Sequence, residues 1–576
     1  MENKEIARLL SETADLMEVA GEDAFRIRSY RNGAAAVASY PERITDLLCN
    51  PDRKVTEIAG IGKGLASVIA EICQRGTFER REQMLSKYPA SALELLKIQG
   101  LGPKSIALLY EHHGVKTVDD LERICREQKL RELPRMGAKL EEKVLRSIEA
   151  YRKTAGRFLL SFGRRVADEL RDEFLALPGI ENVEAAGSLR RGRETIGDLD
   201  LLVTGPGSAE TLNRLVKHPK AFETLGLGAN KASVKFGVEH LQVDVRALSA
   251  ENFGAALQYF TGSKEHNVVL RTNAIKRGLT LNEYGLFAIE TNERVAGGDE
   301  EEVYRRLGYD WIPPELRENC GELEAAQAHL LPKLLELTDI RGDLHMHTTA
   351  TDGKASLREM ADAAAARGYQ YIAITDHSKA LAMSNGLDEK RVVEFAQEVR
   401  ELNRDGLPLR IFSGLECDIL RDGAMDIAED ALVELDLVIG SVHSYMNLEP
   451  PETTDRLLRA LDSPSLRILG HLTGRLLLQR ESYVFDFDRV AAKAAERGVC
   501  LEVNASPERL DLPSHLVRTA KRKGCRFTIS TDAHRTTHLD NMRFGVITAR
   551  RGWLEASDVL NTKPLAEFEA AIKARS

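Results

Sequence analysis

The sequence lacks a long apolar run, a cysteine pair and a signal-peptide pattern. No apolar run reaches the roughly 20 residues that a membrane-spanning helix needs, so we expect no membrane partner. The opening residues, MENKEIARLL, have neither the apolar stretch nor the small-residue cleavage site of a signal peptide. The 7 cysteines are scattered singly, which disfavours a disulfide framework or a thiolate zinc site. Together these absences predict a protein of the reducing cytoplasm.

The length and the net charge of the chain say less about the class of protein than these absences do. At 576 residues the chain is too long for one hydrophobic core, and about three or four domains are expected. The net charge of −9 at first disfavours a nucleic-acid partner. Carboxylates that hold metal ions would also create an acidic excess, so the bulk charge does not decide the class of protein.

The pattern of apolar residues changes along the chain. Residues 1–150 have helical spacing broken by short glycine-containing turns, and from about residue 183 short β-rich runs mix with helices. Residues 311–338 contain Pro313–Pro314 and have the character of a linker with one helix. After Asp339, short apolar strands alternate with amphipathic helices, which predicts a parallel α/β barrel of about seven units.

The first chemical motif is GSLRRGRETIGDLDLLV (187–203). Asp198 and Asp200 alternate on a predicted strand, so both carboxylates leave the same face. Asp244, in QVDVR on a second β-like run, would complete a cradle of hard oxygen donors suited to Mg²⁺. Two ions held close together would activate a 3′-hydroxyl and neutralise a leaving pyrophosphate.

The residues before these aspartates decide between two interpretations of the motif. An Asp-x-Asp pair by itself is usually a solvated strand edge. Here a Gly187–Ser188 turn offers backbone N–H groups to phosphate oxygens, and Arg190 and Arg191 add guanidinium charge. The combination favours a nucleotidyl-transfer site.

These motifs resemble the palm of family X DNA polymerases, the relatives of DNA polymerase beta. The resemblance spans roughly residues 1–316 and continues into YFTGSKEHN (259–267) and GLTLNEYGLF (278–287). It implies an α+β nucleotidyltransferase palm at 151–250, a thumb-type nucleotide-selection subdomain at 251–316 and a linker at 317–338. It makes Asp198, Asp200 and Asp244 the catalytic metal ligands. The residues that it assigns to the incoming nucleotide are Ser188, Arg191, Gly197, Tyr259, Phe260, Gly262 and Asn267.

The resemblance gives these residues separate tasks. Ser188 and Arg191 would contact the triphosphate, and Asn267 would reach the minor-groove edge of the base. Tyr259, Phe260 and Gly262 would shape the sugar pocket, while Arg271 would contact the template strand. One departure is Gln242, which stands where eukaryotic relatives have an arginine two residues before the third aspartate. This difference puts in doubt how the third carboxylate is held.

Two earlier segments share the helix-hairpin-helix form. IAGIGKGLASVIAEI (58–72) and IQGLGPKSIALLYEH (98–112) each place apolar-x-Gly-apolar-Gly before an amphipathic helix. The glycines allow a tight turn whose N–H groups approach a DNA phosphate, a contact that positions DNA without reading its sequence. One such turn is often only a connector, but two copies before a palm favour DNA binding. The expected contacts are Gly60, Gly62, Lys63, Gly100, Gly102 and Lys104, together with Arg271.

The hairpins also define the helical part of the chain. The resemblance implies an N-terminal helical DNA-binding domain at 1–80 and a fingers-type helical domain at 81–150. A third segment, LPRMGAKLEEKVL (133–145), has lost one glycine and is a weaker candidate. The lyase lysine of eukaryotic relatives corresponds to Val68, so the resemblance does not carry the lyase activity over to this chain. Carbonyl groups that would hold monovalent cations lie near Thr56, Ile58, Ile61, Leu96, Ile98 and Leu101.

The second chemical motif is a set of histidines at predicted strand ends. One buried histidine is usually a core residue, but the carboxyl ends of parallel strands meet at one mouth of a barrel. Mixed imidazole and carboxylate donors suit Zn²⁺ or Mn²⁺, and so many donors predict two or three ions that activate water against a phosphate. The histidines are His345, His347, His377, His443, His471 and His534, joined by Asp352, Asp376, Glu416 and Asp532.

DLHMHTTATDG, ITDH, GLECDI, SVHS, ILGH and STDAH together resemble the PHP domain, the polymerase-and-histidinol-phosphatase family, over roughly 339–576. The resemblance implies a metal-dependent phosphoesterase with every ligand position kept. Asp376 is expected to orient a histidine. Arg475 would either contact the scissile phosphate or be an ordinary surface arginine. The implied ligands are His345, His347, Asp352, His377, Glu416, His443, His471, Asp532 and His534.

The sequence therefore predicts a monomeric repair polymerase that fills short gaps in primed DNA with deoxynucleoside triphosphates. Its PHP site would be a Mn²⁺- or Zn²⁺-dependent 3′→5′ exonuclease, with abasic-site incision or 3′-phosphate removal open to the same chemistry. The alternative is a template-independent nucleotidyltransferase fused to a small-molecule phosphatase of the histidinol-phosphatase type. A third, non-enzymatic interpretation is a scaffold that binds DNA ends.

Overall fold

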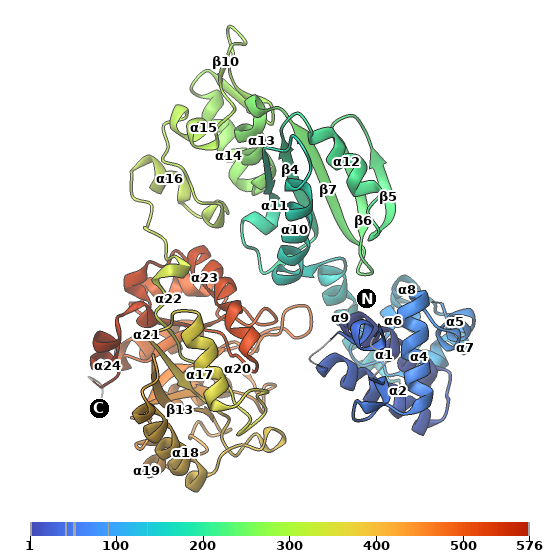
Figure 1. The fold of residues 1–576 in the computed structure, drawn as a ribbon, viewed down its shortest axis with the longest axis vertical. Coiled ribbons are helices and arrows are strands. Elements are labelled where there is room, and N and C mark those ends of the chain that lie inside the picture. The colour runs from blue at the N-terminus through green and yellow to red at the C-terminus, as the bar shows by residue number, and fades with distance from the viewer. Residues whose placement is uncertain (1–2, 41–42, 50–52, 90, 135, 574–576) are drawn as a thin grey trace. The chain divides into compact units, whose positions relative to one another are not determined.

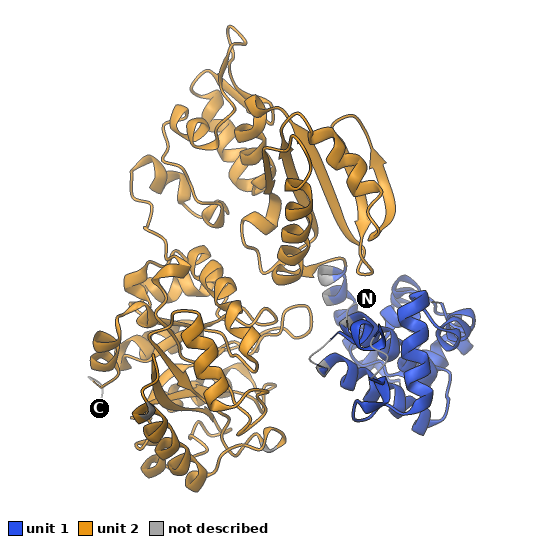
Figure 2. Ribbon diagram, in the orientation of Figure 1, with its two compact units in different colours: residues 1–155 blue, residues 156–576 orange. Residues whose placement is uncertain are grey.

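The computed structural model describes residues 3–40, 43–49, 53–89, 91–134 and 136–573. The chain separates into two compact units, residues 1–155 and 156–576 (Figure 2). No helix in these described ranges has the length and apolar character needed to cross a membrane.

The first unit is helical, as the sequence predicts. Its apolar side chains form two cores, one around Ile6, Leu10 and Phe78 and the other around Leu95 and Leu109. Its helices are α1 (Asn3–Val19), α2 (Ala24–Ser39), α3 (Ile44–Cys49), α4 (Lys63–Arg75), α5 (Glu79–Lys87), α6 (Ala92–Leu95), α7 (Pro103–His113), α8 (Val118–Arg126) and α9 (Ala138–Thr154) (Figure 1).

The second unit begins with a five-stranded sheet in the order β2-β4-β7-β6-β5. The short β-rich runs predicted after about residue 183 include LDLLVTG, KASVKFG and HLQVDVRAL, which form β4, β6 and β7. Within this sheet only the β4–β7 pair is parallel. The strands of this sheet are β2 (Asn182–Ala185), β4 (Asp198–Thr204), β5 (Ala221–Leu227), β6 (Lys231–Phe236) and β7 (Leu241–Leu248). Around them lie α10 (Leu160–Leu175), α11 (Gly187–Arg190), α12 (Ser208–Val216) and the pair β1 (Phe158–Leu159) and β3 (Thr195–Ile196).

A smaller α/β part follows, with a three-stranded antiparallel sheet in the order β10-β9-β8. The segment predicted as a linker is packed rather than extended, because Leu323, Ala326 and Leu334 share a core with Leu270 and Tyr304. The elements are α13 (Phe253–Thr261), α14 (Lys264–Ile275), β8 (Leu279–Asn282), β9 (Gly285–Ala288), β10 (Arg294–Ala296), α15 (Glu300–Arg306) and α16 (Glu322–Gln327).

The last part is a seven-stranded parallel sheet whose strands follow chain order from β11 to β17. The sheet nearly closes into a barrel, since Met346 bridges Ala533 and the Thr531 N–H donates to the Asp343 carboxylate at 3.0 Å. The strands are β11 (Gly342–Asp343), β12 (Tyr371–Ile374), β13 (Arg410–Asp418), β14 (Leu437–Ser441), β15 (Leu466–Leu469), β16 (Cys500–Asn504) and β17 (Phe527–Ser530). The predicted barrel of about seven units is thus confirmed.

Helices connect these strands, as parallel pairing requires (Figure 1). The connecting helices are α17 (Leu357–Ala366), α18 (Glu389–Leu402), α19 (Glu429–Leu432), α20 (Pro450–Ala460), α21 (Phe487–Arg497) and α22 (Ser514–Arg522). Two further helices, α23 (Met542–Arg551) and α24 (Leu565–Lys573), follow the last strand. Their amphipathic pattern buries one face against the sheet, for example Val392, Phe395 and Val399 of α18.

The barrel and the five-stranded sheet share a hydrophobic core. Leu510 and Phe544 of the barrel belong to the same buried cluster as Leu199 and Val243 of the sheet. The barrel also packs closely against the glycine motif. A Cβ atom added to Gly192 would clash with Ile547 Cγ2, so a larger residue would not fit there. The second unit therefore carries both predicted sites on one packed body.

Candidate metal centres

The three aspartates of the first predicted site lie on neighbouring strands. β4 and β7 run in parallel, and their register places Asp200 opposite Asp244 and Asp198 opposite Gln242. Because paired residues of a sheet share a face, the three carboxylates project from the same side. Gly187 lies against them at φ +63°, and a Cβ there would be 3.2 Å from Asp200 Oδ2. The glycine motif therefore covers the aspartate site.

Burial and mutual repulsion both act on the carboxylates of this site. Burial, followed by the charges of Asp198 and Asp244, raises the pKa of Asp200 to about 6. Burial alone would raise the pKa of Asp244 too, but Lys231 and other donors lower it, and Lys231 Nζ lies 2.6 Å from Asp244 Oδ2. Gln242 Nε2 donates to the other Asp244 oxygen at 3.3 Å. Such crowding of carboxylates fits a site for divalent cations.

The aspartates are not gathered as tightly as bound ions would require. Among the described residues they do not form a group whose ligand atoms all lie within 4.8 Å of one another. The physical reason is the competition by Lys231 for Asp244, together with the repulsion between the three like charges. A bound cation would offset that repulsion and draw the oxygens together.

Several residues predicted to contact the nucleotide meet beside this sheet. Arg191 Nε donates to Glu318 Oε1 at 3.1 Å, and its Nη1 donates to the Thr261 carbonyl oxygen. A Cβ at Gly262 would lie 3.1 Å from Arg191 Nη1, so these two predicted residues are neighbours. Ser188 lies within α11. Gly197, half-buried, directly precedes β4.

The remaining predicted residues are linked through α13 and α14. The rings of Tyr259 and Phe260 meet edge to face at 5.1 Å. Asn267 donates to the Tyr259 carbonyl oxygen at 2.8 Å and accepts from Gln258 at 2.7 Å. Arg271 donates to the Asn267 carbonyl oxygen at 3.3 Å. These contacts fix the relative positions of the predicted sugar, base and template residues.

The prediction of a phosphate contact for Arg190 is wrong in this structure. Its two terminal nitrogens each donate to a Glu300 oxygen at 2.8 Å. Fully buried Arg317 donates to the same carboxylate at 2.6 Å, and Trp311 Nε1 at 2.9 Å. Arg190 therefore ties the glycine motif to α15 through one buried carboxylate. No local pattern in the sequence pairs residues 190 and 300.

We expect Glu300→Ala to lower the free energy of unfolding by about 3–5 kcal/mol, because it leaves the buried guanidinium of Arg317 and the half-buried one of Arg190 without this carboxylate. Urea unfolding followed by the fluorescence of Trp311 would measure it. Exposed Glu301, the next residue of α15, provides the control, and Glu301→Ala should change stability by less than about 0.5 kcal/mol. Equal effects of the two substitutions would contradict the role assigned to Glu300.

The same network predicts a pH dependence. Burial alone would raise the pKa of Glu300, but Arg317 and Arg190 outweigh it and hold the pKa far below its ordinary value. The ionised carboxylate thus stabilises the fold above its unfolded pKa of about 4.3, and this contribution is lost as the pH falls further. Acid titration of unfolding should show a smaller loss below about pH 4 in Glu300→Gln than in the wild type.

The two predicted hairpins of the first unit have the same geometry. Gly60 and Gly100 have φ values of +90° and +99°, and Gly62 and Gly102 directly precede α4 and α7. Lys63 and Lys104 therefore lie in the first turns of these helices, where free N–H groups attract anions. In the weaker segment, the Met136 N–H donates to the Leu133 carbonyl oxygen at 3.1 Å. Arg135 lies outside the described residues.

The carbonyls expected to hold monovalent cations are partly engaged in these turns. The Ile58 oxygen accepts from Ile61 N–H at 3.0 Å, and the Ile98 oxygen accepts from Leu101 N–H at 3.3 Å. A carbonyl oxygen has two lone pairs, so these bonds leave room for a further ligand. The cation sites remain a prediction.

The predicted ligands of the second site converge at the carboxyl ends of the barrel strands. Three groups have ligand atoms that all lie within 4.8 Å of one another, and His347 and His377 each belong to two of them. The groups are His347–Asp352–His377–His534, His345–His347–Asp532 and His377–Glu416–His443. His471, the remaining predicted ligand, places Nε2 2.8 Å from Glu416 Oε1.

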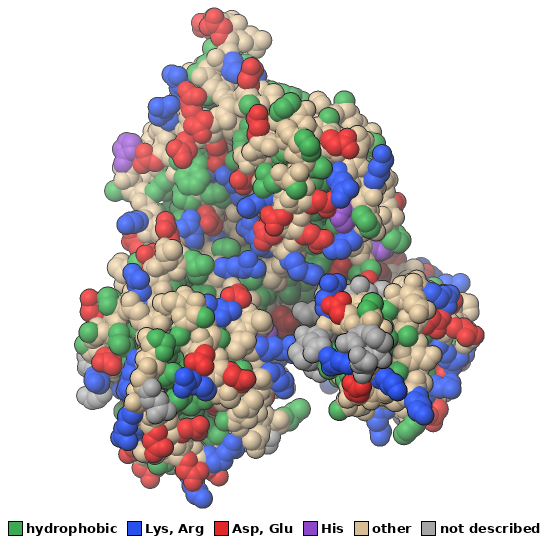
Figure 3. All heavy atoms as spheres, in the orientation of Figure 1, with side chains coloured by type: hydrophobic (Ala, Val, Ile, Leu, Met, Phe, Trp, Pro, Cys, Tyr) green, Lys and Arg blue, Asp and Glu red, His purple; other side chains and the backbone are tan. Residues whose placement is uncertain are grey.

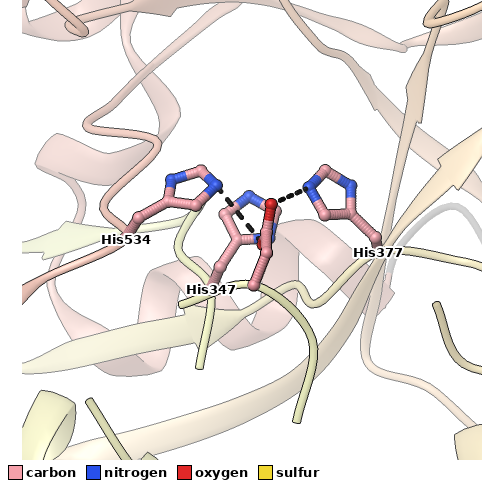
Figure 4. Close-up of side chains that lie close together, drawn as sticks. His347, His377 and His534 are labelled. Atoms are coloured by element: carbon pink, nitrogen blue, oxygen red, sulfur yellow. Dashed lines mark ion pairs between the residues drawn. The ribbon is translucent and has the colours of Figure 1, made fainter. Parts of the chain in front are cut away.

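Figure 4 shows His347, His377 and His534 pointing toward one another. The dashed ion pairs join His377 and His534 to Asp352, at 3.5 and 3.4 Å. Two further ligands, His471 and Asp532, have φ values of +25° and +55°, which side-chain-bearing residues rarely adopt. Such backbone strain is concentrated at functional sites.

The donor set fits divalent cations. Buried ring nitrogens of His345, His347, His377 and His471 have no hydrogen-bond partner among the described residues, and neither does Asp352 Oδ1. Burial, followed by His377 and His534, lowers the pKa of His347 to about 3, so its ring is neutral as a ligand must be. Burial alone would lower the pKa of His345, but Glu502 and Glu416 outweigh it and raise it. Cations between these groups would satisfy both the free nitrogens and the buried carboxylates.

Two residues that orient the ligands were not predicted from sequence. Glu502, on β16, lies 2.7 Å from His345 Nδ1, and Asp418, at the end of β13, lies 3.0 Å from His443 Nδ1. Such carboxylates fix which imidazole nitrogen faces a metal. Their only sequence signal is an acidic residue within an otherwise apolar buried strand.

Asp376 has a different role from the one predicted. It accepts hydrogen bonds from the Thr348 N–H at 2.8 Å, the Thr348 hydroxyl at 2.6 Å and the Thr351 hydroxyl. Asp376 therefore fixes the loop that follows His347 rather than the ring of a histidine.

The predicted phosphate contact of Arg475 is also unsupported by its position. Its guanidinium donates to the carbonyl oxygens of Arg509, at 2.9 Å, and Leu510, and lies 3.7 Å from Glu194. Arg509 instead reaches the metal ligands, with Nε 3.5 Å from Asp532 Oδ2. The positively charged side chain next to the histidine cluster is therefore Arg509, which the sequence motifs did not indicate.

Both signs of charge are interspersed on the face visible in the space-filling view (Figure 3). The net charge of −9 therefore does not correspond to one acidic surface on this face.

Family models match four parts of the chain. A helix-hairpin-helix domain matches residues 1–78, and a SAM-like helix-hairpin-helix tandem matches 92–150. The DNA polymerase beta thumb matches residues 256–318, and the PHP domain matches 343–506.

Curated relatives match the whole chain or one of its halves. The chain is 38% identical over 574 residues to the DNA polymerase/3'-5' exonuclease PolX of Bacillus subtilis (strain 168), which covers 100% of both chains. It is 25% identical over 347 residues to DNA polymerase lambda of Arabidopsis thaliana, covering 55% of this chain and 62% of that one. A Clostridium acetobutylicum protein named as a probable phosphatase is 28% identical over 203 residues, covering 33% of this chain and 78% of that one.

The full-length match spans both the aspartate sheet and the histidine barrel of this chain. Together with the polymerase beta thumb, helix-hairpin-helix and PHP matches, it confirms the resemblance seen in the sequence. The chain belongs to the family X DNA polymerases that carry a C-terminal PHP domain.

Proposed function

We propose that this chain is a DNA-directed DNA polymerase that fills short gaps during DNA repair and also degrades DNA from the 3′ end. The observation that supports the proposal is that two clusters of potential metal ligands, of different chemistry, lie on one packed body. The first is a set of oxygen donors, and the second is a mixed set of nitrogen and oxygen donors. The full-length relative is named for both activities.

In the proposed polymerase site, Asp198, Asp200 and Asp244 would hold Mg²⁺, which activates a 3′-hydroxyl and neutralises a leaving pyrophosphate. Their shared face on β4 and β7 supports this assignment. Arg191, half-buried beside Gly262, presents its guanidinium next to the residues assigned to the sugar. Asn267 is fixed by Gln258 and the Tyr259 backbone, so it would meet a base without first losing side-chain freedom.

DNA and deoxynucleoside triphosphates are the proposed substrates, and a monomer is the proposed state. Lys63 and Lys104 at the two hairpin turns would contact backbone phosphates and set the register of the duplex. Such contacts carry no sequence information, which suits an enzyme that acts on gaps of any sequence.

In the proposed exonuclease site, the nine ligands would hold two or three Mn²⁺ or Zn²⁺ ions, which lower the pKa of an attacking water and polarise the phosphate. Glu502 and Asp418 orient the imidazoles of His345 and His443. Arg509 lies beside Asp532, where its charge would stabilise a pentavalent phosphate. Abasic-site incision and 3′-phosphate removal would use the same groups.

The polymerase half is tested by single-nucleotide incorporation into gapped DNA opposite each of the four template bases. We expect the complementary nucleotide to be preferred by at least about 100-fold, since a templated site reads pairing geometry. Incorporation that is indifferent to the template would instead support a template-independent nucleotidyltransferase and would contradict the proposal.

The barrel half is tested by comparing 3′-ended DNA with histidinol phosphate as substrates of the Mn²⁺-loaded protein. We expect degradation of DNA to be faster in kcat/KM, with nucleoside monophosphates as products. Preference for histidinol phosphate would favour the small-molecule phosphatase suggested by the clostridial relative's name. Failure of both substrates, with DNA still bound, would favour the scaffold.

A further inference from the structure

An open cavity of about 530 Å³ adjoins the histidine cluster. The metal ligand His443 forms part of its wall, so the cavity opens directly onto the proposed site of phosphate cleavage. Its volume lies within the range typical of small-molecule sites. The other lining residues are Tyr445, Met446, Asn447, Gly474, Arg480, Glu481, Ser482 and Tyr483.

The wall that contains Tyr445 is held rigidly. Tyr445 has a φ of +51°, which is rare for a residue with a large side chain. Fully buried Arg456, on α20, donates to the Ser444 carbonyl oxygen at 2.9 Å and to the Leu420 carbonyl oxygen at 2.9 Å. It also donates to the Ile419 carbonyl oxygen. One arginine thus ties the loop after β13 to the strained turn after β14.

The opposite wall is also built from fixed backbone. The loop that begins at His471 turns back on itself, and Arg480 exchanges backbone hydrogen bonds with Leu476 at 2.7 and 2.8 Å. Arg480 Nε donates to the Gly474 carbonyl oxygen at 2.9 Å. Gly474 has a φ of +63°, and a Cβ there would lie 2.7 Å from the Tyr483 ring. This packing leaves a guanidinium and a tyrosine facing the cavity.

The chemistry of the two walls suits a nucleotide. Tyr445 remains 56% exposed although Arg421 lies over its ring at 5.8 Å, so ring surface is available for stacking. Aromatic rings stack on any base, and arginine binds phosphate and adds cation–π attraction. The amide of Asn447 offers both a donor and an acceptor to sugar or base.

We propose that this cavity binds the 3′-terminal nucleotide of the DNA strand, with its base against Tyr445 and its 5′-phosphate directed toward the metal ligands at His443. Arg480 contacts the backbone of the same nucleotide. The assignment rests on the proposed exonuclease activity and adds the element that recognises the terminal nucleoside. Because stacking tolerates every base, the site removes nucleotides without sequence preference.

The test compares two single-stranded oligonucleotides that differ only at the 3′ end, one ending in thymidine and the other in an abasic tetrahydrofuran residue. The wild type should remove the thymidine-bearing nucleotide with a kcat/KM roughly 5- to 100-fold higher. Tyr445→Ala should lose that advantage and leave the abasic-ended rate within about twofold. Tyr445→Phe, which keeps the ring, should retain the advantage.

Two controls separate recognition from misfolding. Hydrolysis of bis(4-nitrophenyl) phosphate, which has no nucleoside, should fall far less in Tyr445→Ala than removal of the thymidine-bearing nucleotide, and an equal fall would overturn the role of the cavity. Tyr284→Ala removes an equally exposed tyrosine, 57% exposed and on the β8–β9 turn, and should leave the thymidine preference intact.

The outcomes distinguish the cavity from the activity. A wild type that does not degrade either oligonucleotide overturns the exonuclease assignment itself. A wild type that degrades both equally, or Tyr445→Ala that slows both equally, overturns the role of the cavity and leaves the exonuclease intact.

Discussion

Replacing Asp200 with asparagine is expected to lower nucleotide incorporation by at least about 1000-fold while 3′-end degradation stays within about twofold of the wild type. Asparagine keeps the shape of the side chain but removes the charge that faces Asp198 and Asp244 across β4 and β7. Loss of one charged ligand weakens the stabilisation of the pyrophosphate leaving group, and each tenfold in rate corresponds to about 1.4 kcal/mol.

Single-turnover extension of a gapped primer in Mg²⁺ would measure the first activity, and release of nucleotides without triphosphates would measure the second. Asp172→Asn, on an exposed position of α10, is the matched control and should leave both activities unchanged. If Asp200→Asn extends primers at the wild-type rate, the aspartate set is not the polymerase centre. If it loses both activities while folded, the two sites are not independent.

The variant is expected to fold, because ionised Asp200 is unfavourable in the metal-free protein. The folded state raises the pKa of this carboxyl to about 6, mainly through burial and then through its two aspartate neighbours. The folded protein therefore binds the proton more tightly than the unfolded chain, and stability falls as the pH rises from about 4 to about 6. Asparagine removes this loss, so metal-free Asp200→Asn should melt at or above the wild-type temperature at pH 7.5.

The sequence predicted best those features that repeat with the period of a strand. Alternation placed Asp198 and Asp200 on one face, and the structure has them there on β4. Histidines at the ends of apolar runs predicted a common mouth, because all parallel strands of a barrel end on the same side. Eight of the nine predicted ligands accordingly fall into the three close groups, and His471 lies against Glu416.

What the sequence could not provide were the side-chain pairs between distant segments. Arg190 binds Glu300, and Arg475 binds backbone carbonyls near Leu510, although each was expected to contact phosphate. An arginine in a motif has the same local pattern whether its partner is a ligand or a buried carboxylate. The choice is made by tertiary packing, which brings α15 beside α11 and leaves Glu300 only 6% exposed.

The packing of the barrel against the aspartate sheet could not be predicted from the sequence either. Arg551, on α23, donates to the Arg191 carbonyl oxygen at 2.7 Å and to Glu318 Oε1 at 3.1 Å. Glu318 is also the partner of the Arg191 guanidinium. The barrel thus supports the backbone of a residue assigned to the triphosphate, so a clean separation of activities requires point substitutions within each site rather than removal of a domain.

The second large effect is expected at Glu416, which is 1% exposed and faces five histidines. Glu416→Gln should lower 3′-end degradation by at least about 1000-fold and leave single-nucleotide incorporation within about twofold. We expect this large loss because Glu416 lies at the centre of the histidine cluster. Its oxygens lie 2.9 Å from His377 Nδ1, 3.3 Å from His443 Nε2 and 2.8 Å from His471 Nε2, so it is the anionic donor that these rings share.

The measurement combines single-turnover degradation in Mn²⁺ with the metal content of the dialysed protein. Glu416→Gln should retain fewer ions per chain than the wild type, whereas Asp430→Asn, exposed on α19, should retain the same number and the same activity. Because degradation opposes extension, the variant should also accumulate longer products when triphosphates are limiting. Wild-type degradation by Glu416→Gln would contradict the metal centre, since no other carboxylate among the described residues could replace a donor that lies between His377, His443 and His471.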